Sequence, residues 1–128
     1  MSDLSDGLED GGDWTAEWRA DFGAVPPFAS DLHEITPAGE AAYRAARRWI
    51  FEQRDDGLSA AQKELLMMVM NIAVSNRDGA VIHMGNARRH GATVMQVREA
   101  LAQCVLFLGV VEFLKTGQAV WQACRDLP

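Results

Sequence analysis

Cysteine is scarce in this sequence, which has Cys104 and Cys124 as its two cysteines in 128 residues. Each lies inside an apolar periodic segment, so a disulfide-stabilised scaffold is excluded and a reducing compartment is the natural one. Long apolar runs are lacking as well, because none approaches the roughly 20 residues that span a bilayer. We therefore expect a cytoplasmic protein without a membrane-spanning segment.

Positive charge is in deficit, with 12 Lys and Arg against 18 Asp and Glu and a formal net charge of −6. A DNA or RNA partner requires an excess of basic residues, so nucleic acid is excluded as the main partner. Residues 1–13 carry several acids and no Lys or Arg, which predicts an acidic, flexible tail. This start has neither a basic nor an apolar stretch, so we expect no signal peptide. The rest of the chain, residues 14–128, is expected to form a single domain.

Strand-like alternation is absent, and apolar residues recur with the helical period. Pairs of the capping-box type open two helices, at Ser59 with Gln62 and at Thr93 with Gln96. Pro37 and Asp78 indicate two further helix starts, while Pro26–Pro27 is expected to stop the chain's first helix. The helices that these signals predict span residues 14–22, 37–53, 60–76, 79–90, 94–108 and 110–124. The fold class is therefore all-α, a helical bundle of about six to seven helices with antiparallel neighbours.

The helix beginning at residue 37 combines an apolar face with a group of arginines. Its expected inner face comprises Ala42, Ala46, Trp49 and Ile50. The arginines are Arg44, Arg47 and Arg48. A solvated helix face is the simplest interpretation of this group, and a clamp for a carboxylate substrate or an inter-subunit salt bridge is the alternative.

The helix of residues 60–76 is apolar nearly all round, which predicts burial nearly all round. Its polar residues Glu64, Asn71 and Ser75 share one narrow stripe. This stripe is either the solvent edge of a core helix or the place where Glu64 enters a partly buried cleft. In such a cleft a carboxyl group can donate or accept a proton.

His83 is the second polar group of interest, on the helix of residues 79–90. Small residues surround it on its face of the helix, and space beside an imidazole suits a substrate. The alternative is an ordinary surface histidine. His90 precedes Gly91 at the helix end, where a protonated imidazole interacts favourably with the helix dipole. The two histidines lie roughly 10 Å apart along the axis, too far to share one ion, so no metal site is expected.

One group of residues is spaced in a recognisable pattern along the sequence, at positions 58, 63–65, 83, 87, 89–93, 97–100 and 108–110. In these residues the sequence resembles the carboxymuconolactone decarboxylase and AhpD-like superfamily. The peroxidase branch of this family has Cys-x-x-Cys before its histidine and a glutamate twelve residues before the first cysteine. This sequence keeps the glutamate as Glu64 and the histidine as His83, but has Asn76 and Gly79 in place of the two thiols. The resemblance is thus to the branch that lacks the cysteine pair.

The resemblance implies an all-helical subunit, assembly into homotrimers or homohexamers, and no organic cofactor. We expect a lyase that decarboxylates a small carboxylated lactone or keto acid, with His83 as general acid/base and Glu64 as its partner. Asn71, Asn76 and His90 are the expected substrate-binding residues. An isomerase or lactone hydrolase using the same pair, or a non-catalytic oligomeric binding protein, is the alternative. A thiol peroxidase is disfavoured.

Overall fold

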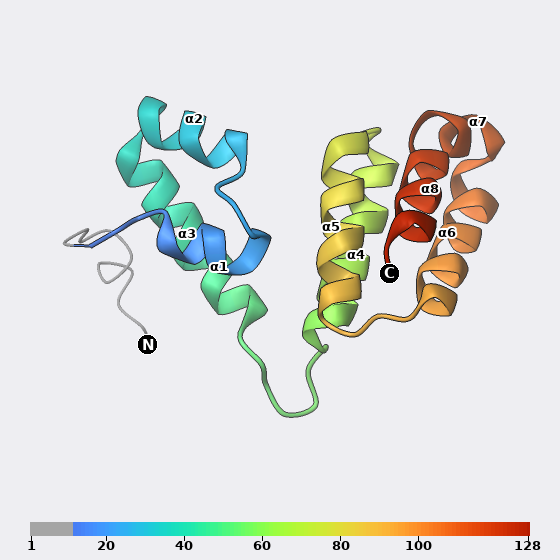
Figure 1. Cartoon of the computed structure of the whole chain (residues 1–128), viewed down its shortest axis with the longest axis horizontal. Coiled ribbons are helices and arrows are strands. Elements are labelled where there is room, and N and C mark those ends of the chain that lie inside the picture. The colour runs from blue at the N-terminus through green and yellow to red at the C-terminus, as the bar shows by residue number, and fades with distance from the viewer. Residues whose placement is uncertain (1–11) are drawn as a thin grey trace. The chain divides into compact units, whose positions relative to one another are not determined.

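The computed structural model in Figure 1 describes residues 12–128, and every regular element in that range is a helix. The all-α prediction is confirmed for this part of the chain. Of the predicted acidic tail, residues 1–11 lie outside the described residues. The chain divides into two compact units, Met1–Glu52 and Gln53–Pro128, so the single domain expected over residues 14–128 stays a prediction.

The first unit contains three helices, α1 (Ala16–Phe22), α2 (Pro27–Ile35) and α3 (Pro37–Phe51). α1 ends as predicted at Gly23, which has the left-handed φ of 79°. α1 does not extend past Pro26–Pro27, but α2, which begins at Pro27, was not predicted from the sequence. Pro27 occupies the first helical position, where its missing N–H has no intrahelical partner to lose.

The inner face predicted for α3 is wrong. Its predicted members Ala42, Ala46, Trp49 and Ile50 are all exposed. The helix instead buries Glu40 and Ala41. The Glu40 carboxylate accepts hydrogen bonds from the Trp18 indole N–H at 2.8 Å and from Arg44 Nε at 2.8 Å. A polar network that satisfies a buried charge therefore replaces an apolar face.

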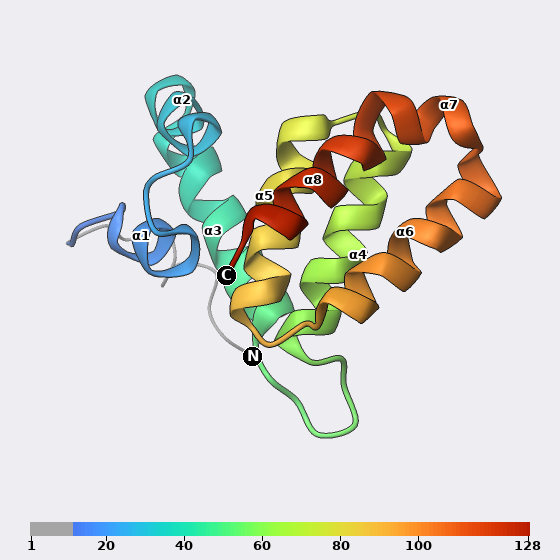
Figure 2. The ribbon, with the colours of Figure 1, turned by 45° about the vertical axis from the view of Figure 1, so that its right-hand side comes forward.

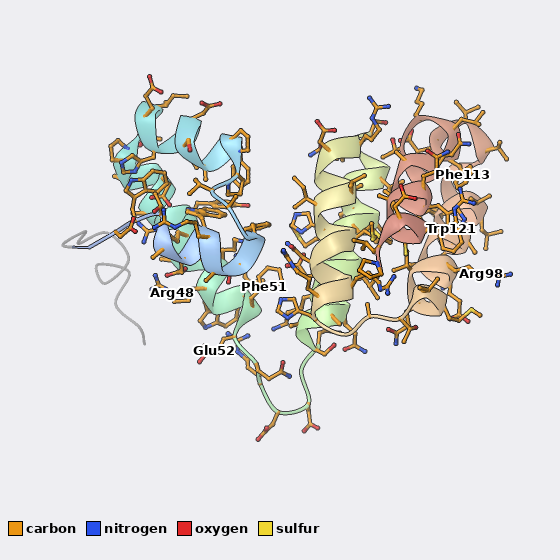
Figure 3. The ribbon with its side chains drawn as sticks, viewed as in Figure 1. Arg48, Phe51, Glu52, Arg98, Phe113 and Trp121 are labelled. Atoms are coloured by element: carbon orange, nitrogen blue, oxygen red, sulfur yellow. The ribbon has the colours of Figure 1, made fainter. Side chains whose placement is uncertain are left out.

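All three arginines of α3 pair with carboxylates of the same unit. Besides the Arg44 pair, Arg47 Nη1 lies 2.6 Å from Asp21 Oδ2, and Arg48 Nη2 lies 2.5 Å from Glu17 Oε1. Arg44 and Arg47 are only 12% exposed, so neither is part of a solvated face. Figure 3 shows these side chains, with Arg48 labelled near the end of α3.

The second unit contains α4 (Ala60–Ala73), α5 (Arg77–Arg89), α6 (Val94–Leu108) and α8 (Gln118–Asp126), with α7 (Val110–Glu112) and the π-helical turn η2 (Phe113–Gly117) between the last two. α4 and α5 run antiparallel, as do α6 and α8 (Figures 1 and 2). α4 packs on α6, and α8 packs on both α5 and α6. Each of the four long helices contributes two residues to one core, which comprises Met68, Ile72, Ala80, Met84, Val97, Leu101, Val120 and Cys124.

Both predicted capping boxes are confirmed, with reciprocal hydrogen bonds of 2.9–3.1 Å at Ser59–Gln62 and 3.0 Å at Thr93–Gln96. Gly91 and Gly109 have left-handed φ values of 100° and 90° where the sequence predicts breaks. Several helix boundaries differ from the prediction. α4 ends at Ala73 because Ser75 turns the chain with a φ of 58°.

The last predicted helix, residues 110–124, is divided by the π-helical turn at Phe113–Gly117. Thr116 lies buried in this turn, and its hydroxyl donates to the Glu112 carboxylate at 2.8 Å. The same carboxylate accepts from the Ser75 hydroxyl at 2.8 Å. Because a π-turn adds one residue to a helix without changing its apolar composition, the period of a short segment does not reveal it.

Several large apolar side chains lie at the surface of the second unit. Leu66 and Met70 on one side of α4, and Val74 directly after its end, are 45–75% exposed, so the prediction that this helix is buried nearly all round is wrong. Leu106 and Phe107 at the end of α6 are 88% and 89% exposed. None of the helices within residues 12–128 combines the length and apolar character that a bilayer crossing requires.

The buried Glu40 predicts a pH dependence of stability. Burial on its own raises the pKa of this carboxyl group, but the hydrogen bonds from Arg44 and Trp18 and the Arg44 charge outweigh it, so the pKa lies below its ordinary value of 4.5. A lowered folded-state pKa stabilises the fold above pH 4.5, and this stabilisation is lost as the pH falls through the folded pKa. We expect Glu40→Gln to lower the free energy of unfolding at pH 7 by about 3 kcal/mol, and the difference from the wild type to shrink at acidic pH.

Urea unfolding followed by tryptophan fluorescence between pH 3 and pH 7 measures both effects. Glu17→Gln is the matched control, because its salt bridge with Arg48 is exposed and should change stability by less than about 1 kcal/mol. A difference that stays constant with pH would show that the charge of Glu40 has no part in the stabilisation.

Candidate functional site

Glu64 and His83 meet between α4 and α5. Glu64 lies in the second turn of α4 and is 1% exposed, on the same face as the core residues Met68 and Ile72. Its Oε2 lies 2.6 Å from Nδ1 of His83, which comes from the middle of α5. The interpretation of the polar stripe as a solvent edge is therefore wrong for Glu64. The antiparallel packing of α4 on α5 brings together two residues nineteen positions apart.

The geometry of this contact determines which ring nitrogen of His83 faces the carboxylate. A separation of 2.6 Å between a carboxylate oxygen and an imidazole nitrogen is typical of a strong, charge-assisted hydrogen bond. It fixes the plane of the imidazole and directs Nδ1 at the carboxylate. The His83 side chain is 13% exposed and that of Glu64 is 2% exposed, so a molecule arriving from solvent reaches the imidazole before the carboxylate.

Asn71 and Asn76 lie together at the other end of the α4–α5 pair. Asn76 Nδ2 donates to Asn71 Oδ1 at 2.8 Å, and Asn71 Nδ2 donates to the Met67 carbonyl at 2.7 Å. Asn76 Oδ1 accepts the Gly79 backbone N–H at 3.3 Å, so Asn76 caps α5 and the expected cap Asp78 does not. These bonds hold the helix connection in place, and substrate binding by the two asparagines stays a prediction.

This arrangement occupies the two positions where the peroxidase branch has its thiols. A Cβ atom at Gly79 would lie 2.6 Å from Asn76 Nδ2 and still closer to Asn71 Oδ1. A larger residue at position 79 therefore requires the carboxamides of Asn71 and Asn76 to move from their present positions. At the positions of the two thiols, Asn76 therefore forms hydrogen bonds and Gly79 leaves the space that they need.

His90 is exposed at the C-terminal end of α5, where its backbone N–H donates to the Asn86 carbonyl at 3.0 Å. Seven residues of helix correspond to about 10 Å along the axis, so the structure does not bring His90 to the His83 ring. Its position at the end of the helix agrees with the dipole interaction expected from the sequence. A role for His90 in substrate binding is untested by this geometry.

The two cysteines contribute to packing. Cys124 is 1% exposed within the core of the second unit, and Cys104 packs against that core. Burial raises the pKa of the Cys104 thiol, which disfavours the reactive thiolate. Within residues 12–128, no group of three or more His, Cys, Asp and Glu side chains is arranged to hold a metal ion.

Asn86 is a buried polar residue of α5 that was not singled out from the sequence. Asn86 is 2% exposed, and its Oδ1 accepts a hydrogen bond from Arg89. Its Nδ2 is buried without an acceptor among the described residues. The one available signal was its spacing of three residues from His83, which places the two side chains on neighbouring positions of one helix surface.

Comparison with known proteins gives the class. The model of the carboxymuconolactone decarboxylase family matches residues 37–120, and the chain belongs to this family. Both Glu64 and His83 lie within the matched range. The fold is similar to the crystal structure of a proposed carboxymuconolactone decarboxylase from Burkholderia xenovorans LB400, with a TM-score of 0.81 and 23% sequence identity over 97% of this chain and 92% of that one. A search of the curated proteins gave no match.

Two glycines of α5 offer a test of the asparagine arrangement. We expect Gly79→Ala to lower the free energy of unfolding by up to about 1 kcal/mol, because the new methyl group displaces the carboxamides of Asn71 and Asn76 and disturbs the exposed hydrogen bond between them. Gly85→Ala is the matched control, because a Cβ there meets nothing within 4 Å. The control should be neutral or stabilising by up to about 1 kcal/mol, as alanine favours the helix. Equal effects of the two substitutions in urea unfolding would contradict this account of Gly79.

Proposed function

We propose that this protein is a cofactor-free lyase of the cytoplasm that removes CO₂ from a small carboxylated lactone or keto acid. The observation that carries the proposal is the 2.6 Å hydrogen bond between the buried Glu64 carboxylate and the partly exposed His83 imidazole. Family membership supports a decarboxylase-like reaction. A carboxylated lactone or keto acid is a substrate class that one imidazole and one carboxylate can decarboxylate without a cofactor.

The reaction requires two functional groups from the protein, a hydrogen-bond donor and an acid. When the bond from the substrate carbon to its carboxylate breaks, CO₂ leaves and the electron pair moves into the conjugated lactone or ketone group as an enolate. A hydrogen-bond donor must stabilise the enolate oxygen, and an acid must then protonate carbon. Because Nδ1 of His83 contacts Glu64, Nε2 is the ring atom that would deliver this proton. The Glu64 carboxylate orients the ring and stabilises the imidazolium before transfer, and the ring then regains its proton from water.

Two other activities of the same pair remain as alternatives. Removal and return of a proton at carbon would make the protein an isomerase, and activation of water by the imidazole would make it a lactone hydrolase. A non-catalytic binding protein would retain the fold without turnover. A thiol peroxidase is disfavoured, because Cys104 has a raised pKa and Cys124 is buried in the core.

Substitution of the pair tests the proposal. We expect Glu64→Gln and His83→Gln each to lower kcat/KM by about 10²–10⁴-fold, the usual contribution of a general acid or base. Glu99→Gln is the matched control, because Glu99 is an exposed carboxylate on α6. The assay is release of labelled CO₂ from carboxylated butenolides and β-keto acids. Deuterium exchange at carbon and ring opening, followed on the same compounds by NMR, identify the isomerase and hydrolase alternatives.

A protein with none of the three activities on any compound, or with activity unchanged in both variants, would overturn the proposal. Circular dichroism accompanies each assay to show that the variant is folded, because His83→Gln weakens the hydrogen bond to the buried Glu64 carboxylate. Glu64→Gln is the gentler change, since its carboxamide can still hydrogen-bond the ring.

We also propose that the chain associates with further copies of itself, as a trimer or hexamer. The support is the group of large apolar residues at the end of α6 and the start of α7, where Leu106, Phe107, Val110 and Val111 are 62–89% exposed. Adjoining apolar side chains of this size are typical of surfaces that a partner covers. We expect light scattering to give a multiple of the 14.1 kDa chain mass, and Phe107→Glu to shift the distribution toward smaller species. A monomer across the micromolar range would contradict self-association.

A further inference from the structure

Asn86 carries a polar group that the fold itself does not use. The residue is 2% exposed, and its Nδ2 has no hydrogen-bond acceptor within residues 12–128. Buried amide groups in native proteins nearly always have a partner, and an exception costs the fold the desolvation free energy of the group. The chain's other asparagines, Asn71 and Asn76, are more exposed and yet both have protein partners.

The orientation of the Asn86 amide is fixed by its neighbour. The Arg89 guanidinium donates to Asn86 Oδ1, and a guanidinium has donors only, so it identifies the oxygen end of the carboxamide. The NH₂ group is therefore the end without a partner, and it is a donor. An unused buried donor suits an oxygen of a bound molecule, above all one with negative charge.

Asn86 lies three residues after His83 on α5, which puts the two side chains on adjoining positions of one helix surface. The Cβ atoms of such a pair are about 5–6 Å apart. A small ligand can span that separation, with its reacting carbon next to the His83 imidazole and one of its oxygens next to the Asn86 amide. Glu64, which belongs to α4, contacts the Nδ1 atom of the His83 ring.

We propose that the Asn86 NH₂ group donates a hydrogen bond to the anionic oxygen of the substrate bound at His83. In the decarboxylation proposed above, on which this inference rests, that oxygen is the substrate's carbonyl oxygen as it becomes the enolate. Asn86 supplies the oxyanion donor that the reaction requires, while His83 supplies the proton. The desolvation cost of the unpaired amide is then recovered when the substrate binds.

The binding half of the proposal can be tested without turnover. The probe is 5-oxotetrahydrofuran-2-carboxylate, a saturated lactone acid without the conjugation needed to lose CO₂. We expect its titration into ¹⁵N-labelled wild-type protein to shift the side-chain amide resonances of Asn86, assigned by their absence in Asn86→Leu. The amide resonances of Asn71 and Asn76 serve as internal references. Shifts at those two with none at Asn86 would overturn the proposal.

The kinetic half separates a role in the reaction from a structural one. Asn86→Leu removes the donor and keeps the size of the side chain, so we expect kcat/KM for CO₂ release to fall about 10²–10³-fold, as on loss of an oxyanion donor. The melting temperature should change little, because the buried unpaired donor is gone while Arg89 loses its hydrogen bond to Oδ1. Gln103→Leu, at an exposed carboxamide on α6, is the control for activity.

The outcomes distinguish this inference from the proposed function. If the wild type releases CO₂ and Asn86→Leu does so equally well, the inference fails and the proposed function stands. If the probe shifts Asn86 but no compound is decarboxylated, the amide is an anion-binding group and the proposed reaction fails. A fall in melting temperature that accounts for the lost activity would show that Asn86 is structural and would overturn the inference.

Discussion

A buried carboxylate needs a hydrogen-bonding partner, and in the second unit this requirement joins Glu64 of α4 to His83 of α5. Two charged or polar groups withdrawn from water stabilise a fold only when they meet with good geometry. The 2.6 Å contact therefore adds a directional constraint to the apolar packing of α4 on α5. The same contact fixes the orientation of the imidazole, which the proposed function uses.

The first unit satisfies the same requirement with different chemistry. Glu40 is as deeply buried as Glu64, but its hydrogen bonds come from the Trp18 indole and the Arg44 guanidinium, while His33 Nδ1 lies 3.6 Å away. An indole and a guanidinium hold their protons throughout the physiological range, whereas an imidazole exchanges its proton near neutral pH. The partner, and not the burial of the carboxylate, makes the Glu64 pair a candidate for catalysis and the Glu40 network a structural one.

Local signals in the sequence predicted the helix ends well and the helix faces less well. Ser59, Thr93 and Gly91 act through groups within one turn of chain, so their geometry follows from the sequence alone. The inner face of α3 does not, because burial of Glu40 depends on Trp18, twenty-two residues away. The π-turn before α8 was missed for a similar reason, since its hydrogen bond to Glu112 joins it to Ser75 across thirty-seven residues.

The amino-acid pattern alone was enough to predict the all-α class, the two capping boxes, the absence of a thiol pair at positions 76 and 79, and the choice of Glu64 and His83 as the residues of interest. These follow from side-chain chemistry and from spacing along one helix, which need no knowledge of the rest of the fold. The packing of the helices was needed to show that Glu64 points inward and that the Asn86 amide has no partner within the described chain. Each of these depends on atoms brought close by the packing of separate helices, and a one-dimensional pattern carries no measure of that distance.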